Sequence, residues 1–153
     1  MKNRGFTLVE SMTVLTLIGV ALAIMAPSLL GGLRRTTTRA AMDQFISAHA
    51  LARSMAVRYG RLAALHIDPS ADRYWIEVDT ATGLTTAMDT VGRVRSLSED
   101  GVDLASDRSV LCFDARGFPS TRDSCESPAA TLVFSSAERS DTLRISSFGK
   151  AER

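Results

Sequence analysis

The chain has 153 residues, with 18 basic and 17 acidic side chains and a formal net charge of +1. A balance this close to zero gives no global field for nucleic acid or for cations, so either partner would need a local patch. The length accommodates one domain and an anchor. Two cysteines without a C-x-x-C spacing and two distant histidines do not form a zinc ligand set. We expect no metal site and no cofactor.

An apolar stretch from Met12 to Leu33 dominates the beginning of the chain. Its 22 residues match the roughly 20 that a helix needs to span a bilayer. We therefore expect a membrane helix over residues 6–33, interrupted by Gly19 and Pro27. Proline removes a backbone hydrogen bond, so Pro27 should kink or loosen the preceding turn. The alternative is that glycine and proline are simply commoner in membrane helices.

One carboxylate, Glu10, lies at the head of this stretch. An acid in the middle of the membrane costs roughly 2.5–3.5 kcal/mol on insertion scales. An ionisable residue in a membrane segment is therefore expected to be functional. It ends the segment GFTLVE, which begins at Gly5 and Phe6. This segment resembles the processing site of type IV prepilins and type II secretion pseudopilins. The resemblance implies cleavage after Gly5 by prepilin peptidase, N-methylation of Phe6, and a role for Glu10, with Gly19 and Pro27, in assembly. The alternatives are an ordinary secretory signal, whose apolar run would be shorter, and a plain signal anchor.

Basic residues flank the apolar stretch on both sides. Arg34, Arg35 and Arg39 follow it and outnumber Lys2 and Arg4 before it. A positive-inside count therefore favours the reverse of the orientation that the processing motif requires. We place the leader in the cytoplasm and the C-terminal part in the periplasm of a bacterial inner-membrane protein, and the sequence alone leaves the conflict open.

A second helical segment is predicted over residues 39–60. The run Thr36–Thr38 favours a helix poorly, and Thr38 is a candidate N-cap for the segment that follows. Apolar residues then recur at spacings of three and four, which predicts one buried stripe. Gly60 fits a C-cap position. The expected stripe consists of Ala41, Phe45, Ala48, Ala52, Met55 and Tyr59.

From residue 62 onward the pattern changes to short β-prone runs. Residues 62–67 and 74–78 flank a turn signal at 68–72 and predict a hairpin. Residues 80–83 form another turn signal, and residues 84–108 are expected to be loop with one short strand. The remaining strand candidates are 110–114, 131–135 and 142–147. A helix followed by an antiparallel sheet makes the fold class α+β.

Three segments of this second part resemble the GspH/FimT group of minor pseudopilins and pilins. They are the helix end around Arg53 (ARSMA), the strand end Cys112–Gly117 (CFDARG) and the closing segment Leu143–Lys150 (LRISSFGK). The resemblance implies a pilin-like fold, in which a long N-terminal helix packs on a small antiparallel head. The implied organisation is a leader (1–5), a transmembrane and assembly helix (6–33), the periplasmic half of the helix (34–60) and a head (61–153).

The same resemblance implies the function. The protein would be a minor subunit that co-assembles near the tip of a type II secretion pseudopilus or a type IV pilus. Its partners would be other pilins or pseudopilins, the inner-membrane assembly platform and prepilin peptidase. Secretion and pilus use are not separated by the sequence.

Cys112 and Cys125 enclose 12 residues. If the head is exported, a disulfide is the expected state, and closing a loop of that size is worth roughly 3 kcal/mol. The alternative is two free thiols.

Chemistry of other kinds has little support. No nucleophile elbow or phosphate-binding loop frames a catalytic group, so we expect no enzyme. His49 lies among apolar residues of a predicted helix and is expected to be solvated or hydrogen-bonded rather than a ligand. The alternative function is a DNA-binding minor pilin of a transformation pilus, with contacts from Arg144, Lys150 and Arg153. After processing, 16 basic side chains would face 17 acidic ones, and Glu152 breaks the basic tail, so a solvated tail is favoured.

Overall fold

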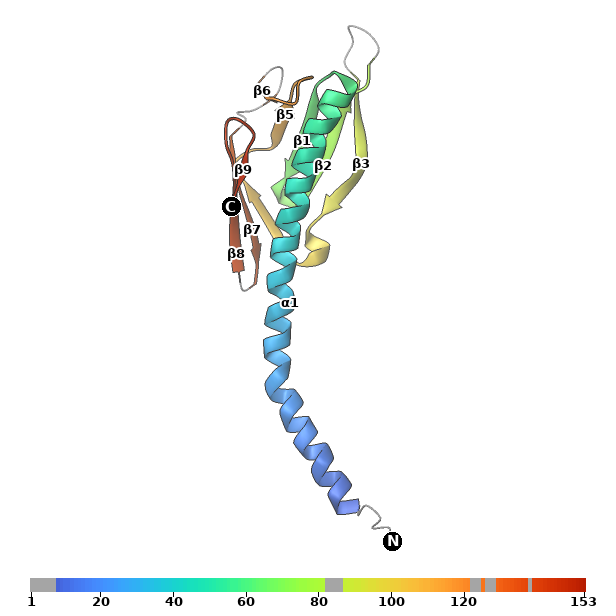
Figure 1. Ribbon diagram of the computed structural model, residues 1–153, viewed down its shortest axis with the longest axis vertical. Helices are drawn as coiled ribbons and strands as arrows, with labels where there is room; N and C mark the ends of the chain where they lie inside the picture. Colours follow the sequence, from blue (N-terminus) through green and yellow to red (C-terminus); the bar gives the residue numbers. More distant parts are fainter. Residues whose placement is uncertain (1–7, 82–86, 122–124, 126–128, 138) are drawn as a thin grey trace, which may run out of the picture. The chain divides into compact units, whose positions relative to one another are not determined.

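The computed structural model describes residues 8–81, 87–121, 125, 129–137 and 139–153, and within its helix it describes side chains outside residues 24–36. The described chain begins with one long helix, α1 (Leu8–Tyr59), and continues into short strands. Two compact units can be distinguished, Met1–Arg35 and Thr36–Arg153. The second unit contains both sheets and is called the head below (Figure 1).

The strands of the head form two antiparallel sheets. The first has the order β3 (Met88–Ser96), β2 (Arg73–Asp79), β1 (Ala63–Asp68), β5 (Val110–Phe113) and β6 (Pro119–Ser120). The second has the order β4 (Asp103–Ser106), β7 (Ala130–Ser136), β8 (Arg139–Ile145) and β9 (Ala151–Glu152). Two short 3-10 helices, η1 (Pro69–Ala71) and η2 (Ser98–Asp100), connect β1 to β2 and β3 to β4. The α+β class and the predicted order of a long helix followed by antiparallel strands are thereby confirmed.

The core forms where the second half of α1 meets the two sheets. In Figure 1 this half has β2 and β3 on one side and β7 and β8 on the other. Phe45 is fully buried, and its ring meets those of Tyr74 from β2 at 5.1 Å and Phe134 from β7 at 5.8 Å. Both contacts are edge-on, the geometry that aromatic pairs prefer. One helical residue therefore joins the two sheets into a single core.

The predicted helical stripe is correct over most of its length. Ala41, Phe45 and Ala52 are buried, and Ala48 and Met55 pack against the core. Tyr59 is 47 % exposed, so its assignment to the stripe was wrong. Tyr59 is the last residue of the helix. The buried face also includes residues outside the predicted stripe, among them Met42, His49 and Ala56.

The C-terminal end of α1 follows from Gly60. This residue has φ +65°, a left-handed conformation that glycine adopts without steric cost. The N–H of Gly60 donates to the carbonyl of Val57, and the N–H of Arg61 donates to that of Ala56. These two bonds form a Schellman motif, which confirms the predicted C-cap.

The N-terminal start predicted for the second helical segment is wrong. The helix continues through Thr36–Thr38 as part of α1, and the helical assignment also runs through Gly19 and Pro27. The kink or loosened turn expected at Pro27 stays a prediction. Thr38 is fully buried, and its hydroxyl donates to the Ser136 hydroxyl at the end of β7, at 3.2 Å. Tertiary packing at Thr38 therefore outweighs the modest helix propensity of threonine.

The five predicted strands are confirmed with small shifts at their ends. The prediction for residues 84–108, a loop with one short strand, was wrong in part: the described residues 87–108 contain a short strand, β4, but also the nine-residue β3. β3 is an edge strand whose side chains are mostly exposed, and its register against β2 shifts between Tyr74 and Ile76. It therefore lacks the alternation of buried and exposed residues by which strands are recognised in sequence.

Candidate functional site

The N-terminal site begins outside the described residues, because Gly5 and Phe6 lie in the part that the structure does not describe. Glu10 lies in the first turns of α1 with its side chain exposed. The large apolar side chains around it are also exposed, from Leu8 (77 %) and Val9 (70 %) to Leu15 (66 %). A helix that is apolar on every side does not have the single buried stripe of a globular protein.

Two further residues were assigned to assembly. A Cβ atom built on Gly19 would meet nothing within 4 Å, so this glycine does not serve packing within the described chain. Pro27 lies within α1, among the residues whose side chains are not described. No helix among the described residues is long and apolar enough to meet the criterion for crossing a membrane.

The three segments that carry the resemblance in the head converge on Arg53. Its Nε donates to the carbonyl of Gly117 at 3.0 Å, and its Nη1 donates to the carbonyl of Gly149 at 3.3 Å. Gly117 lies in the turn between β5 and β6, and Gly149 lies in the turn between β8 and β9. One side chain of α1 thus holds one turn from each sheet. We call Arg53, Gly117 and Gly149 the arginine clamp.

Both glycines of the arginine clamp are required by their surroundings. They have φ +77° and +75°, where side chains other than glycine are strained. A Cβ on Gly149 would lie 2.9 Å from Cγ of Pro119, and one on Gly117 would lie 3.0 Å from Cγ2 of Val57. The turns are therefore packed closely against β6 and α1.

The two clamped turns each present a phenylalanine to solvent. Phe118 is 58 % exposed and Phe148 is 83 % exposed. The first turn is fixed by Asp114, whose Oδ1 accepts from the N–H groups of Arg116 and Phe118, both at 2.9 Å. The N–H of Phe118 contributes most to holding the pKa of Asp114 below its usual value, although burial opposes it.

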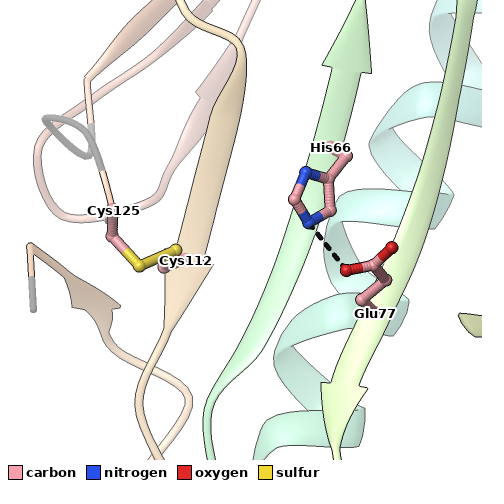
Figure 2. The surroundings of a disulfide bond; sticks show 4 residues. All are labelled: His66, Glu77, Cys112 and Cys125. Carbon is pink, nitrogen blue, oxygen red and sulfur yellow. Dashed lines mark ion pairs between the residues drawn. A yellow bond between two sulfur atoms is a disulfide. The ribbon is translucent and has the colours of Figure 1, made fainter. Parts of the chain in front are cut away.

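Cys112 and Cys125 form the expected disulfide. Cys112 lies in β5, and Cys125 lies in the connection from β6 to β7. Figure 2 shows the bond together with His66 of β1 and Glu77 of β2. The crosslink therefore attaches the β6–β7 connection to the first sheet.

A polar network covers part of the same sheet, on the face away from the core. Nε1 of Trp75 donates to Oε1 of Glu77 at 2.9 Å, and the His66 ring stacks on the Trp75 ring at 5.1 Å. Nε2 of His66 lies 3.1 Å from Oε2 of Glu77, an ion-pair distance without hydrogen-bond geometry (Figure 2). His66, Trp75 and Glu77 are half-buried, so they form a stable surface patch and not an enclosed reaction site.

His49 is buried, which makes the expectation of a solvated side chain wrong. It is only 4 % exposed, its Nε2 is buried without a hydrogen-bond partner, and its ring meets the edge of Phe113 at 5.1 Å. Burial, with a smaller contribution from the charge of Arg53, lowers its pKa to about 4. His49 is therefore a neutral core residue at neutral pH.

The three basic residues suggested for DNA contact do not form a free cationic patch. Nζ of Lys150 lies 3.0 Å from Oε1 of Glu152, and Arg153 forms an ion pair with Asp43 on α1. Arg144 lies opposite Glu152 in the β8–β9 ladder. Two carboxylates, Glu152 and Asp43, thus lie beside the three cations, and Glu152 is shared between Lys150 and Arg144.

Comparison with protein families assigns the chain. The family described as Type II transport protein GspH matches residues 41–149. The chain belongs to the GspH family. A second match, to the prokaryotic N-terminal methylation motif, covers residues 1–26. No curated protein matched the sequence.

The fold agrees with this family. The type IV minor pilin FimU of Pseudomonas aeruginosa PAO1 superposes with a TM-score of 0.56 at 18 % identity, over 77 % of this chain and 88 % of that one. The minor pseudopilin EpsH of the Vibrio cholerae type 2 secretion system superposes with a TM-score of 0.55 at 16 % identity, over 75 % and 94 %. At this identity the likeness establishes the fold.

The GspH-family assignment confirms the resemblance stated from the sequence. The chain is a GspH-family protein with a prokaryotic N-terminal methylation motif, and it shares the fold of the minor pilin FimU and of the minor pseudopilin EpsH. The motif suggests anchoring in the inner membrane followed by entry into a periplasmic pilus. The sequence did not predict that Arg53 binds both glycine turns. Its only signal was an arginine within an alanine-rich helix face.

Proposed function

We propose that this GspH-family protein is a minor subunit that is cleaved after Gly5, methylated on Phe6, and incorporated near the tip of a type II secretion pseudopilus or a type IV pilus. The observation that carries the proposal is the methylation motif over residues 1–26, joined to a GspH-type head. Prepilin peptidase and the inner-membrane assembly platform are the partners that this pathway requires.

The exposed apolar half of α1 supports the proposal. Side chains such as Leu15 and Leu17 are 66 % and 70 % exposed and do not contribute to the core of the head. Apolar surface of this extent is stabilised by lipid or by the helices of other subunits. We assign residues 6–33 to the membrane before assembly and to the helical bundle of the filament afterwards.

Glu10 would guide the docking of each new subunit. Cleavage after Gly5 creates an amine on Phe6 that is protonated near neutral pH. In a medium of low dielectric constant an unpaired charge is costly, so the Glu10 carboxylate and the Phe6 amine of a neighbouring subunit favour one register. Phe6 and Glu10 are also four residues apart, which allows the same pair within one subunit before docking.

The decisive experiment measures processing and assembly separately. Mass spectrometry of the membrane-bound protein should find a chain that begins at N-methylated Phe6, and Gly5→Val should prevent this cleavage. Glu10→Ala should be processed and inserted normally but should be missing from sheared filaments. Val9→Ala, a neighbour on the same helix, is the matched control and should assemble. An intact Met1 terminus in cells with active prepilin peptidase would refute the proposal.

The alternative of a DNA-binding pilin has weaker support, because carboxylates accompany Arg144, Lys150 and Arg153. If the head did bind DNA, the affinity should fall steeply with salt, since phosphate contacts release counterions. Lys150→Ala with Arg153→Ala should then weaken binding equally for all sequences. We expect the head to bind other pilin heads and not duplex DNA.

A further inference from the structure

A group of arginines after the apolar segment remains unexplained by assembly. Arg34, Arg35 and Arg39 lie where the positive-inside rule disfavours them, given a head on the periplasmic side. The side chain of Arg39 is described and is exposed. The inference below rests on the proposed membrane segment and assigns these charges a ligand.

Arg39 lines a cleft of about 530 Å³ in the head, between α1 and β8. Two further arginines line the same cleft, Arg139 at the start of β8 and Arg153 after β9. Among the described residues, the lining consists of Arg39, Met42, Arg139, Ser140, Asp141, Thr142 and Arg153. We call it the arginine cleft.

The arginine cleft lies at the end of the head from which the chain continues toward the apolar segment. The hydrogen bond from Thr38 to Ser136 attaches the end of β7, next to Arg139, to the first helical turn of the head. Arg39 follows Leu33 by six positions, and six residue steps span at most about 22 Å even in a fully extended chain. The polar headgroup layer adjoins the hydrocarbon core and is about 5–8 Å thick on each side. The cleft is therefore within chain reach of lipid headgroups.

The charges of the arginine cleft favour an anion. Nε and Nη2 of Arg139 donate to Asp141 at 2.8 Å, and Arg153 is paired with Asp43. The hydrogen bond from Arg139 and, to a lesser degree, the charge of Arg39 lower the pKa of Asp141, so it is ionised at neutral pH. Among the described side chains, the three guanidinium groups of the cleft face two carboxylates, Asp141 in its lining and Asp43 beside it, which leaves one positive charge in excess. A guanidinium has five N–H donors in a planar fork that matches phosphate oxygens.

We propose that the arginine cleft binds the phosphate of an anionic phospholipid headgroup while the apolar segment is in the membrane. Arg39 supplies the positive charge in excess once Arg139 is paired with Asp141 and Arg153 with Asp43, and Arg139 supplies further N–H donors. Bound lipid holds the head against the membrane surface before the subunit enters a filament. The basic residues after the span then serve headgroup binding and do not determine orientation.

The test uses the full chain purified in mild detergent. Native mass spectrometry measures how much phosphatidylglycerol and how much phosphatidylcholine remain bound as each is titrated. We expect a clear preference for phosphatidylglycerol, which should fall roughly fivefold in Arg39→Gln and about 25-fold when Arg139→Gln is added. Arg58→Gln, an exposed arginine near the other end of the head's helix, is the matched control and should bind lipid normally.

Each outcome has a defined meaning. Arg39→Gln retains the bond between Arg139 and Asp141. A reduced preference for phosphatidylglycerol already in this single variant, with unchanged thermal unfolding of the head, therefore supports the proposal. Equal binding of both lipids, or a preference unchanged in both variants, overturns it. Full competition by millimolar glycerophosphate assigns the cleft to free phosphate and overturns the lipid as its ligand. If the variants lose a partner pilin but not lipid, the cleft binds an acidic protein surface. These measurements are independent of processing and filament assembly, so either proposal can fail alone.

Discussion

The two halves of α1 differ in what covers them. Between residues 8 and 23 every described side chain is exposed, and Leu17 reaches 70 %. Between residues 38 and 59 the exposure alternates, with Phe45 and Ala52 fully buried. Both halves belong to one helix and both are rich in apolar residues. Composition alone would not separate them, whereas periodicity does.

This difference assigns each half to a different partner. The second half is amphipathic and completes the core of its own head. The first half is apolar all around and is available to lipid or to other subunits. Substitutions in the two halves should therefore affect different measurements, and the following predictions run from the largest expected effect to the smallest.

Phe45→Ala should destabilise the head by about 3–5 kcal/mol, because it leaves a cavity between two sheets. Leu15→Ala in the other half should change the same quantity by less than about 0.5 kcal/mol. Urea unfolding of the full chain in mild detergent, followed through the single tryptophan, Trp75, measures both. Equal losses from the two substitutions would contradict the division of α1.

Removing the disulfide should affect the head and not the apolar half. Replacing both Cys112 and Cys125 with serine should lower the free energy of unfolding by about 3 kcal/mol, since the crosslink restricts the unfolded chain. A fragment that begins at Arg34 should show the same loss and should fold without lipid. Quantitative thiol labelling of the native periplasmic protein would contradict the bond.

Acid should lower the free energy of unfolding of the head through His49, which lies in the amphipathic half of α1. Its pKa is 6.5 ordinarily and about 4 in the folded head, so the unfolded state binds more protons between these values. This contribution to stability is complete above pH 6.5 and declines as the pH falls toward 4, by at most about 3 kcal/mol. His49→Leu should flatten this decline in urea unfolding measured from pH 7 to pH 4. An unchanged slope would exclude His49 as its source.

Arg53→Ala should cost about 2 kcal/mol, because two carbonyls lose a charged donor. Arg58→Ala, five residues further along the same helix and exposed, is the control and should change stability by less than about 0.5 kcal/mol. Hydrogen exchange should increase in both glycine turns, around Gly117 and Gly149. Faster exchange in only one turn would show that the arginine clamp holds only that one.

The sequence predicted those parts of the fold whose physical signal is local. Strands such as β2 and β7 largely alternate between buried and more exposed residues, and Gly60 marks the end of α1 by its conformational freedom. β3 was missed because an exposed edge strand has no alternation to detect. The helix through Thr38 was missed because the burial that stabilises it involves Ser136, 98 residues away.

The same reasoning applies to the candidate sites. The GFTLVE segment ending at Glu10 is contiguous and specific, so it could be recognised from the sequence alone. The arginine clamp joins residues 64 and 96 positions apart, and each of its members was noticed separately. The arginine cleft likewise combines α1 with residues from the end of the chain. Sites built from distant segments become visible only in three dimensions.

The arginine clamp also gives the head a mechanical property. A helix advances 100° per residue, so rotating α1 by one position would carry Arg53 away from both carbonyls. A pull or torque applied along α1 would therefore reach the turn of each sheet through Arg53, in addition to the core contacts of Phe45 and the hydrogen bond of Thr38. The turns at Gly117 and Gly149 should follow a movement of α1 for as long as these two hydrogen bonds hold.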